Sequence, residues 1–345
     1  MSAALRVVAP GLMTTVQDFG RIGYQRLGIP VGGALDPLSL RAANLLVGNP
    51  PDAGALEVIA SGPTLAIEAE CVRVAFVGAD ADLSVAGEAF DPRVSRSMLL
   101  RRGDILRVGP LRGSATLYMA VEGGFDIAPV MGSFSTYLRG GLGGWRGRAL
   151  AAGDVLPLKR SSTPERAELA FDTADFAPRR RLRVLEGPQS DYFSEEERAA
   201  FFGREYSVGP GWNRMGMRLV GEPVRHSRGY NVTSDGIVRG SIQIPGDGLP
   251  IVLLAEHQTT GGYPKIGAVI SADLPALGRL GVGSKVAFER VSLKEAEAAG
   301  RAHLALVERL PSRLSPMSAA GSRDLPARLG ETNLVSGVID ACAWS

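Results

Sequence analysis

The chain has 345 residues, a formal net charge of +2 and a hydrophobic content of 45%. This hydrophobic content is that of a globular protein, and the length exceeds what one hydrophobic core usually supports, so we expect two domains. The near-neutral charge, with no dense basic block, argues against a nucleic-acid partner. Nowhere do about 18 consecutive apolar residues predict a membrane span.

The two cysteines, Cys71 and Cys342, lie far apart in the sequence and match neither a disulfide framework nor CxxC spacing. This pattern is typical of a reducing compartment. Residues 1–13 contain an arginine inside a short apolar run and lack the apolar core of a signal peptide. We therefore expect a cytoplasmic protein.

The first half predicts strands with one short helix. Residues 5–35 combine a first strand with a polar loop rich in glycine. Asp36 followed by Pro37 is typical of a helix start and predicts a helix over 37–47. Between residues 56 and 121, short strands separated by Gly- and Pro-containing turns predict a β-barrel or sandwich rather than alternating βαβ units.

Two segments follow that we assign to the surface. Residues 139–153 are rich in Gly and Arg, as a phosphate-binding loop would be, but no GxxxxGK[ST] motif occurs in the sequence, so we interpret them as a surface loop. Residues 161–178 are polar and contain two prolines. They predict a linker and a domain boundary near residue 180.

The second half again predicts strands with few helices. A strand opens it near residue 182, and Ser190 is a predicted N-cap for a helix that contains three glutamates and ends at Gly203. Apolar alternation over 215–219 predicts a half-buried strand with Arg214 at its mouth.

A capping box predicts a further helix near the C-terminal end. Ser292 and Glu295 have the spacing for it, and the helix should run to about residue 310. We therefore predict an N-terminal β domain over 1–180, a C-terminal β domain over 181–310 and a loosely attached tail over 311–345.

A polar loop in the second half is the main candidate for a functional site. A short apolar run, 251–255, predicts a buried strand that leads into residues 257–265, HQTTGGYPK. This loop brings an amide, two hydroxyls, a phenol and an ammonium together around two glycines, which suits a neutral, planar polar ligand. A polar hairpin loop without a ligand remains an equal alternative.

The residue types exclude some chemistries and favour hydrogen bonding. The three histidines have no metal-binding spacing, so we predict no metal. The sequence contains no GxSxG motif, so a covalent nucleophile is not indicated. A site built from amides, hydroxyls and a few charges can hold an amide-like group and stabilise charge that develops on its oxygen. Our catalytic candidates are Lys265, Arg214 and Tyr263. The binding candidates are Gln243, Gln258, Thr259, Thr260, Gly261, Gly262, Pro264 and Asp191, and Asp191 is, with Tyr263, a possible proton carrier.

Several long motifs resemble one protein family. They are GPQSDYF at 187–193, NRMGMRL at 213–219, GSIQIPGDGLPIVLL at 240–254, QTTGGYPKIGAVISADLPALG at 258–278 and GLMTTVQDFGRIGYQRLGIPVGGALD at 11–36. Together they resemble the allophanate hydrolase subunit 2 family, also called the biotin-dependent carboxyltransferase family. The resemblance covers about residues 5–295. Glu256-His257 and Gly278-Arg279 depart from the family pattern and bear on the substrate more than on the fold.

The resemblance implies a mainly β fold with a few short helices, arranged as two cyclophilin-like β-barrel domains, and work with a B-subunit-like partner. It implies three activities. The first is ATP-dependent opening of the cyclic amide 5-oxoproline to glutamate, together with an A-subunit-like lactam-opening protein. The second is the carboxyltransferase step of a biotin-dependent urea or amide carboxylase, and the third is non-catalytic binding that relieves a kinase inhibitor.

We select the 5-oxoprolinase subunit, because a separate chain of this length without a fused biotin module resembles a C subunit. We expect a small-molecule amide substrate, no covalently bound cofactor, ATP used by the assembled complex, and little activity without partner subunits. Biotin, on another chain, would be needed only for the carboxylase alternative.

Overall fold

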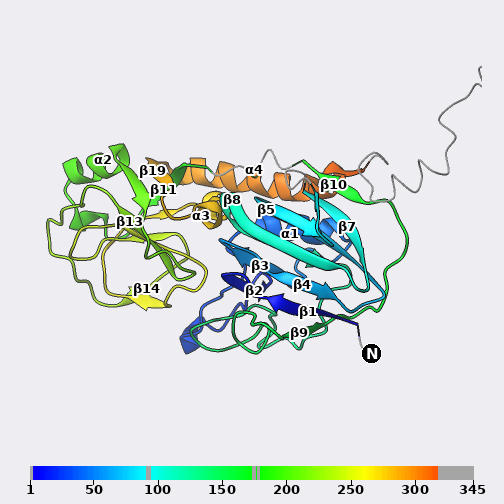
Figure 1. Cartoon of the computed structure of the whole chain (residues 1–345). Coiled ribbons are helices and arrows are strands. Elements are labelled where there is room, and N and C mark those ends of the chain that lie inside the picture. The colour runs from blue at the N-terminus through cyan, green and yellow to red at the C-terminus, as the bar shows by residue number, and fades with distance from the viewer. Residues whose placement is uncertain (1–2, 91–94, 173–175, 177–178, 318–345) are drawn as a thin grey trace, which may run out of the picture.

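The computed structural model describes residues 3–90, 95–172, 176 and 179–317. Two β units lie side by side, and one long helix passes over both of them (Figure 1). The prediction of a mainly β protein with a few short helices is confirmed. The α-helices are α1 (Pro37–Leu46), α2 (Glu195–Gly203), α3 (Leu274–Arg279) and α4 (Leu293–Arg309), and the 3₁₀ turns are Gln25–Leu27, Ser190–Tyr192, Ser271–Asp273 and Leu310–Arg313.

The first β unit is one eleven-stranded sheet centred on two long antiparallel strands, β5 and β8. Their register shifts at two places, which lets the sheet bend around its core. Apolar side chains from its inner face form a continuous core. Its strands are β1 (Ala4–Ala9), β2 (Met13–Gln17), β3 (Ala55–Ile59), β4 (Thr64–Ile67), β5 (Cys71–Val85), β6 (Glu88–Phe90), β7 (Ser95–Arg101), β8 (Ile105–Val121), β9 (Val155–Pro157), β10 (Leu169–Phe171) and β20 (Leu314–Pro316).

The second β unit is a closed barrel of seven strands in the order β11-β18-β15-β16-β13-β12-β19. The barrel closes because β11 pairs antiparallel with β18 on one side and parallel with β19 on the other. Closure leaves no free sheet edge in the barrel. Its strands are β11 (Arg181–Glu186), β12 (Glu205–Val208), β13 (Gly216–Val220), β15 (Ser241–Gln243), β16 (Ile251–Leu253), β18 (Lys265–Val269) and β19 (Lys285–Arg290).

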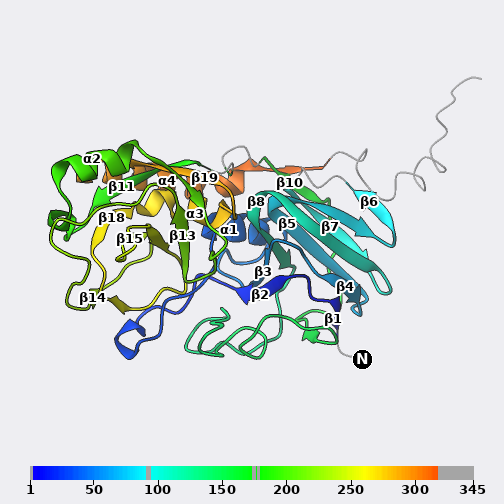
Figure 2. The same ribbon diagram turned by 60° about the vertical axis from the view of Figure 1, so that its left-hand side comes forward.

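A separate two-stranded sheet lies outside the barrel. It consists of β14 (Asp235–Gly236) and β17 (Thr260–Gly261), which pair antiparallel. Figure 2 shows β14 at the lower edge of the second unit, away from α2. This small sheet joins the polar loop predicted from the sequence to a second loop that no sequence motif singles out.

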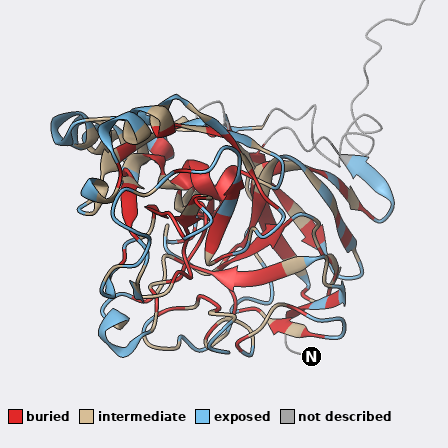
Figure 3. Cartoon of the chain, turned by 90° about the vertical axis from the view of Figure 1, so that its left-hand side faces the viewer, coloured by how far each residue is buried: buried red, intermediate tan, exposed pale blue. Residues whose placement is uncertain are grey.

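Helix α1 follows the sequence prediction closely. The Asp36 carboxylate accepts hydrogen bonds from the backbone N–H groups of Leu38 and Ser39 at 3.1 Å each, and Pro37 occupies the first turn. Most of the helix is buried, and it packs against the long strands β5 and β8. Figure 3 shows buried residues concentrated along the strands and around this helix, with exposed residues in the outer loops.

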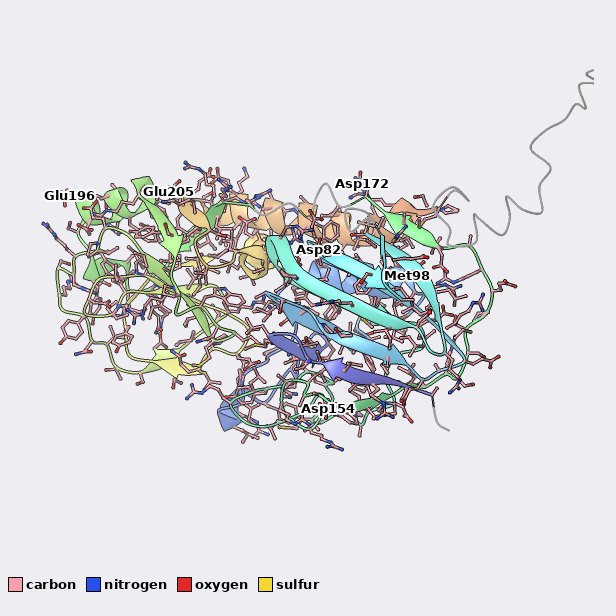
Figure 4. The ribbon with its side chains drawn as sticks, viewed as in Figure 1. Asp82, Met98, Asp154, Asp172, Glu196 and Glu205 are labelled. Carbon is pink, nitrogen blue, oxygen red and sulfur yellow. The ribbon has the colours of Figure 1, made fainter. Side chains whose placement is uncertain are left out.

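The N-cap of helix α2 differs from the prediction. Ser194, not Ser190, accepts the hydrogen bond from Glu197, and Ser190 lies in a preceding 3₁₀ turn. The predicted cap is wrong because the three glutamates occupy the first turn of α2 itself, which leaves Ser194 as the residue directly before it. Figure 4 labels Glu196 in α2, at the outer end of the second unit.

Helix α4 connects the two units. Ser292 and Glu295 form the predicted capping box. Leu306 and Val307, near the other end of the helix, pack against the core around α1 in the first unit. The chain then continues into β20, which pairs with β10. Of the predicted tail, Leu314–Pro316 are therefore a strand of the first sheet, and residues 318–345 lie outside the described part of the chain.

Loss of the Ser292 cap should destabilise the protein slightly. We expect Ser292→Ala to lower the free energy of unfolding by about 1 kcal/mol, because the N–H of Glu295 loses its acceptor. Urea denaturation of the whole chain measures this. Lys294→Ala, two positions along the same helix, should change the value by less than about 0.5 kcal/mol, and an equal effect of both substitutions would contradict the role of the cap.

Candidate functional site

Arg214 lies at the contact between the two β units. Its side chain is only 2% exposed. Nε donates to Glu256 at 2.5 Å, Nη2 donates to the carbonyl of Gly33 at 2.6 Å, and Nη1 donates to Glu57 of β3. One arginine of the second unit is therefore held by two carboxylates, one from each unit.

Two further arginines of the second unit contact the same segment of the first unit. Arg239 donates to the carbonyls of Ala34 and Leu35, and Arg279 of α3 donates to the carboxylate of Asp36 at 2.6 and 3.2 Å. Residues 33–36 are thus bound along their length by three guanidinium groups. We call the groups that meet here the seam network: Asp36, Glu57, Tyr118, Arg214, Arg239, Glu256 and Arg279.

The charges of the seam network balance, with three arginines facing three carboxylates. Burial by itself lowers the pKa of Arg214, but the adjacent carboxylates of Glu57 and Glu256 outweigh it and raise the pKa above its usual value. Burial raises the pKa of Tyr118 well above its usual value, so its hydroxyl stays protonated and donates to Glu57 at 2.6 Å. The same hydroxyl accepts from the N–H of Asp36.

These contacts revise the role that we predicted for Arg214. All three of its nitrogens donate to protein groups, and its side chain is enclosed where the two units meet. A buried guanidinium whose three nitrogens each donate to a protein group in this way joins the two units instead of facing a ligand. The sequence placed Arg214 correctly at the mouth of a strand, but could not show that Glu57, far away in the chain, reaches it.

Lys265 lies in a different place, at the start of β18. Its side chain is only 6% exposed. Nζ donates to Asp235 at 2.9 Å and to the carbonyl of Gly236 at 3.4 Å, so the ammonium contacts strand β14 of the small two-stranded sheet. This hydrogen bond is the main reason that the pKa of Asp235 is below its usual value. The lysine therefore carries its charge in a largely enclosed position, with one exposed carboxylate beside it.

Glutamine side chains surround this lysine. Gln243 of β15 is the strand partner of Lys265 and accepts from Gln258 at 3.3 Å. Gln189 donates to Asp235 at 3.2 Å and accepts from the backbone N–H of Lys265 at 3.4 Å. We call Gln189, Asp235, Gln243, Gln258 and Lys265 the lysine cluster.

One donor of the lysine cluster is buried without a partner. Gln243 is 2% exposed, and its Nε2 donates to no described group. A Cβ at Gly261 would lie 2.6 Å from this Nε2, so the glycine keeps the space beside the amide free of a side chain. A buried donor without an acceptor is costly, and a ligand carbonyl would satisfy it.

Other predicted site residues lie around the lysine cluster with different surroundings. Thr260 and Gly261 form β17, and the carbonyls of Thr259 and Gly262 accept from the 232–237 segment. The carbonyl of Pro264 accepts from Ile244. These residues take part in backbone hydrogen bonds of the small sheet and of the adjoining barrel strands, and their predicted contact with a ligand remains a prediction.

The two predicted proton carriers lie outside the lysine cluster. Tyr263 is 40% exposed. Asp191 is exposed and forms an ion pair with Arg228 at 2.5 Å. Their predicted part in proton transfer therefore remains a prediction.

Two members of the lysine cluster were not predicted from the sequence. Gln189 is part of the GPQSDYF motif, and Asp235 belongs to a Ser-Asp-Gly sequence whose last two residues form β14. The available signal was a polar residue in each of two loops, but only the fold shows that these loops meet at Lys265.

Two general properties bear on what the site can do. Within residues 3–90, 95–172, 176 and 179–317, no group of three or more His, Cys, Asp or Glu side chains could hold a metal ion. No helix in the same part of the chain is long and apolar enough to cross a membrane. The lysine cluster itself offers donors and acceptors suited to an amide.

Comparison with known proteins agrees with the motifs found in the sequence. Residues 27–290 match the family model described as carboxyltransferase domain, subdomain A and B. The 5-oxoprolinase C subunit of Escherichia coli (strain K12) is 36% identical over 317 residues, which are 90% of this chain and 98% of that protein. The 5-oxoprolinase C subunit of Haemophilus influenzae is 36% identical over 82% of this chain and 89% of that protein.

A solved structure has the same fold. The crystal structure of the urea amidolyase of K. lactis superposes with a TM-score of 0.82 at 29% sequence identity. The match covers 90% of this chain but only 20% of that much longer protein.

Removal of the Arg214 charge should strongly destabilise the contact between the two units. We expect Arg214→Met to lower the free energy of unfolding by about 3–5 kcal/mol, because Glu57 and Glu256 stay buried without a cation. Guanidinium chloride denaturation measures the change.

Arg218→Met is the matched control, because Arg218 lies four residues away and forms an exposed ion pair with Asp247. We expect it to cost less than about 1 kcal/mol. If both substitutions cost the same, the seam network does not hold the two units together.

Proposed function

The chain belongs to the carboxyltransferase domain family, subdomain A and B, and from this membership we propose that it is the C subunit of a 5-oxoprolinase. In this function it takes part in the ATP-dependent opening of 5-oxoproline, a cyclic amide, to glutamate. It acts with a B-subunit-like protein and an A-subunit-like lactam-opening protein and has little activity alone. The 36% identity to two 5-oxoprolinase C subunits, over most of each chain, supports this choice.

The observation that carries the proposal is the unpaired, buried Nε2 of Gln243 beside Lys265. A lactam presents one carbonyl acceptor and one N–H donor in a plane. The amide of Gln243 and the ammonium of Lys265 supply donors for the carbonyl. The carboxylate of Asp235 and the Oε1 of Gln258 supply acceptors for the N–H.

The lysine cluster would act by polarising the bound amide. Hydrolysis breaks the C–N bond of the ring while water adds to the carbonyl carbon, so negative charge develops on the carbonyl oxygen. A largely enclosed ammonium stabilises that charge more than an exposed one would, because little water screens it. The lysine cluster therefore favours the addition of water to the carbonyl carbon, the step in which the amide loses its resonance.

A second function uses the same site. The structural match to the urea amidolyase of K. lactis supports carboxyl transfer to urea or a similar amide as the alternative. Urea presents the same carbonyl and N–H groups as a lactam, so the lysine cluster suits both substrates. Biotin would then be carried by another chain.

The experiment that separates the two functions uses the assembled complex. The tagged chain is copurified with its partner subunits and supplied with ATP and 5-oxoproline, and released glutamate is measured. We expect release that depends on both ATP and this chain. Bicarbonate-dependent carboxylation of urea without release of glutamate would replace the first function with the second.

Substitution of the lysine tests the site itself. We expect Lys265→Met in the assembled complex to lower kcat by about 10²–10³-fold, because one donor to the developing oxyanion is lost. Lys294→Met, on the exposed face of α4, removes the same charge far from the lysine cluster and should leave kcat unchanged. Turnover of the Lys265→Met complex at the normal rate would exclude this lysine from catalysis.

A further inference from the structure

A cavity of about 270 Å³ lies away from the lysine cluster, under helix α4. It is an open pocket, lined by α4 on one side, by α3 and the preceding 3₁₀ turn on another, and by Leu38 of α1, Arg183 of β11 and Arg179 just before β11. Its apolar wall consists of Leu38, Ala272, Pro275, Ala276, Ala299, Ala302 and Leu306. Because α1 belongs to the first unit and α3 to the second, the cavity lies under α4 where residues of both units come together.

The polar wall of the cavity carries a small excess of positive charge. It consists of Arg179, Arg183, Asp273, Arg279 and His303. Asp273 is already satisfied, because it accepts from Arg183 at 2.6 and 3.0 Å and from Arg179 at 3.3 Å. Arg279 pairs with Asp36 of the seam network, so the excess charge at the wall comes from Arg179 and Arg183, which share the single carboxylate of Asp273.

Two groups in this wall have unused hydrogen-bonding capacity. Arg279 donates to Asp36 through Nε and Nη2, and its Nη1 donates to no residue in the described part of the chain. The ring of His303 likewise forms no hydrogen bond with a described residue, and burial lowers its pKa. Arg279 is itself 5% exposed, so its position at the cavity is fixed by the surrounding structure.

We propose that this cavity binds a small organic anion that carries a carboxylate. A planar guanidinium donates to a carboxylate in a matched, charge-assisted geometry. The alanine, proline and leucine side chains require that the ligand also has an apolar part, as in most small-molecule sites. Inorganic phosphate has the charge but no such part.

This inference is independent of the proposed function, because no residue of the lysine cluster lines the cavity. Its position under α4 gives it a distinct consequence. A ligand here contacts α4 and α3, and Arg279 of α3 binds Asp36 in the first unit. Occupancy would therefore stabilise the contact between the two units.

The test is isothermal titration calorimetry of the full-length chain with glutarate, a small dicarboxylate, at constant ionic strength in chloride. Inorganic phosphate is titrated in parallel. We expect one equivalent of glutarate to bind. No glutarate binding would overturn the proposal, and binding of phosphate without glutarate would overturn the assignment of a carboxylate ligand.

Two substitutions place the ligand in the cavity by different means. Arg179→Gln removes a charge from the rim, and Ala299→Phe fills the space without a change in charge. Each should weaken glutarate binding by about tenfold or more. Arg102→Gln, an exposed arginine in the β7–β8 turn, is the control and should bind glutarate as the unaltered chain does.

Thermal unfolding checks that the variants are folded. If Ala299→Phe does not fold, Ala302→Leu on the same wall replaces it. Glutarate affinity that is unchanged in both the charge variant and the filling variant would show that the anion binds elsewhere and would overturn the proposal.

Discussion

The ion pairing of Arg214 with Glu57 and Glu256 is the interaction on which the arrangement of the two β units depends. Two carboxylates and a guanidinium are costly to remove from water, and only their close mutual contact offsets that cost. The pairing forms only when the barrel and the sheet are correctly placed, so it selects one arrangement of the two units. Arg239 and Arg279 extend the same contact along residues 33–36.

The sequence predicted local features well, because short-range physics determines them. The Asp36-Pro37 helix start, the capping box at Ser292 and the mainly β character all appear in the structure. It did not predict that α4 packs against the first unit or that Leu314–Pro316 pairs with β10, because these contacts join residues far apart in the chain. Ser190 was chosen as a cap because two serines lie close together before the glutamates.

The candidate site was predicted only in part, because some of its contacts also join residues far apart in the chain. Lys265, Gln243 and Gln258 were identified from residue type, and the structure brings them together. Asp235 and Gln189 were missed because their role depends on strand β14 and a turn that meet only in the fold. Gly278, a departure from the expected family pattern, has a structural explanation. A Cβ there would lie 2.3 Å from the carbonyl oxygen of Leu35.

After α4 the chain returns to the first unit, where β20 pairs with β10. This return has a consequence for how the molecule is held together. The sheet of the first unit is completed by a strand that is made last, after the whole barrel. A protease cut in the linker between β10 and β11 would therefore not release two separate halves. The halves would remain associated through β20, which pairs with β10 of the first unit. During synthesis, the sheet of the first unit can be completed only after the chain has been made as far as residue 316.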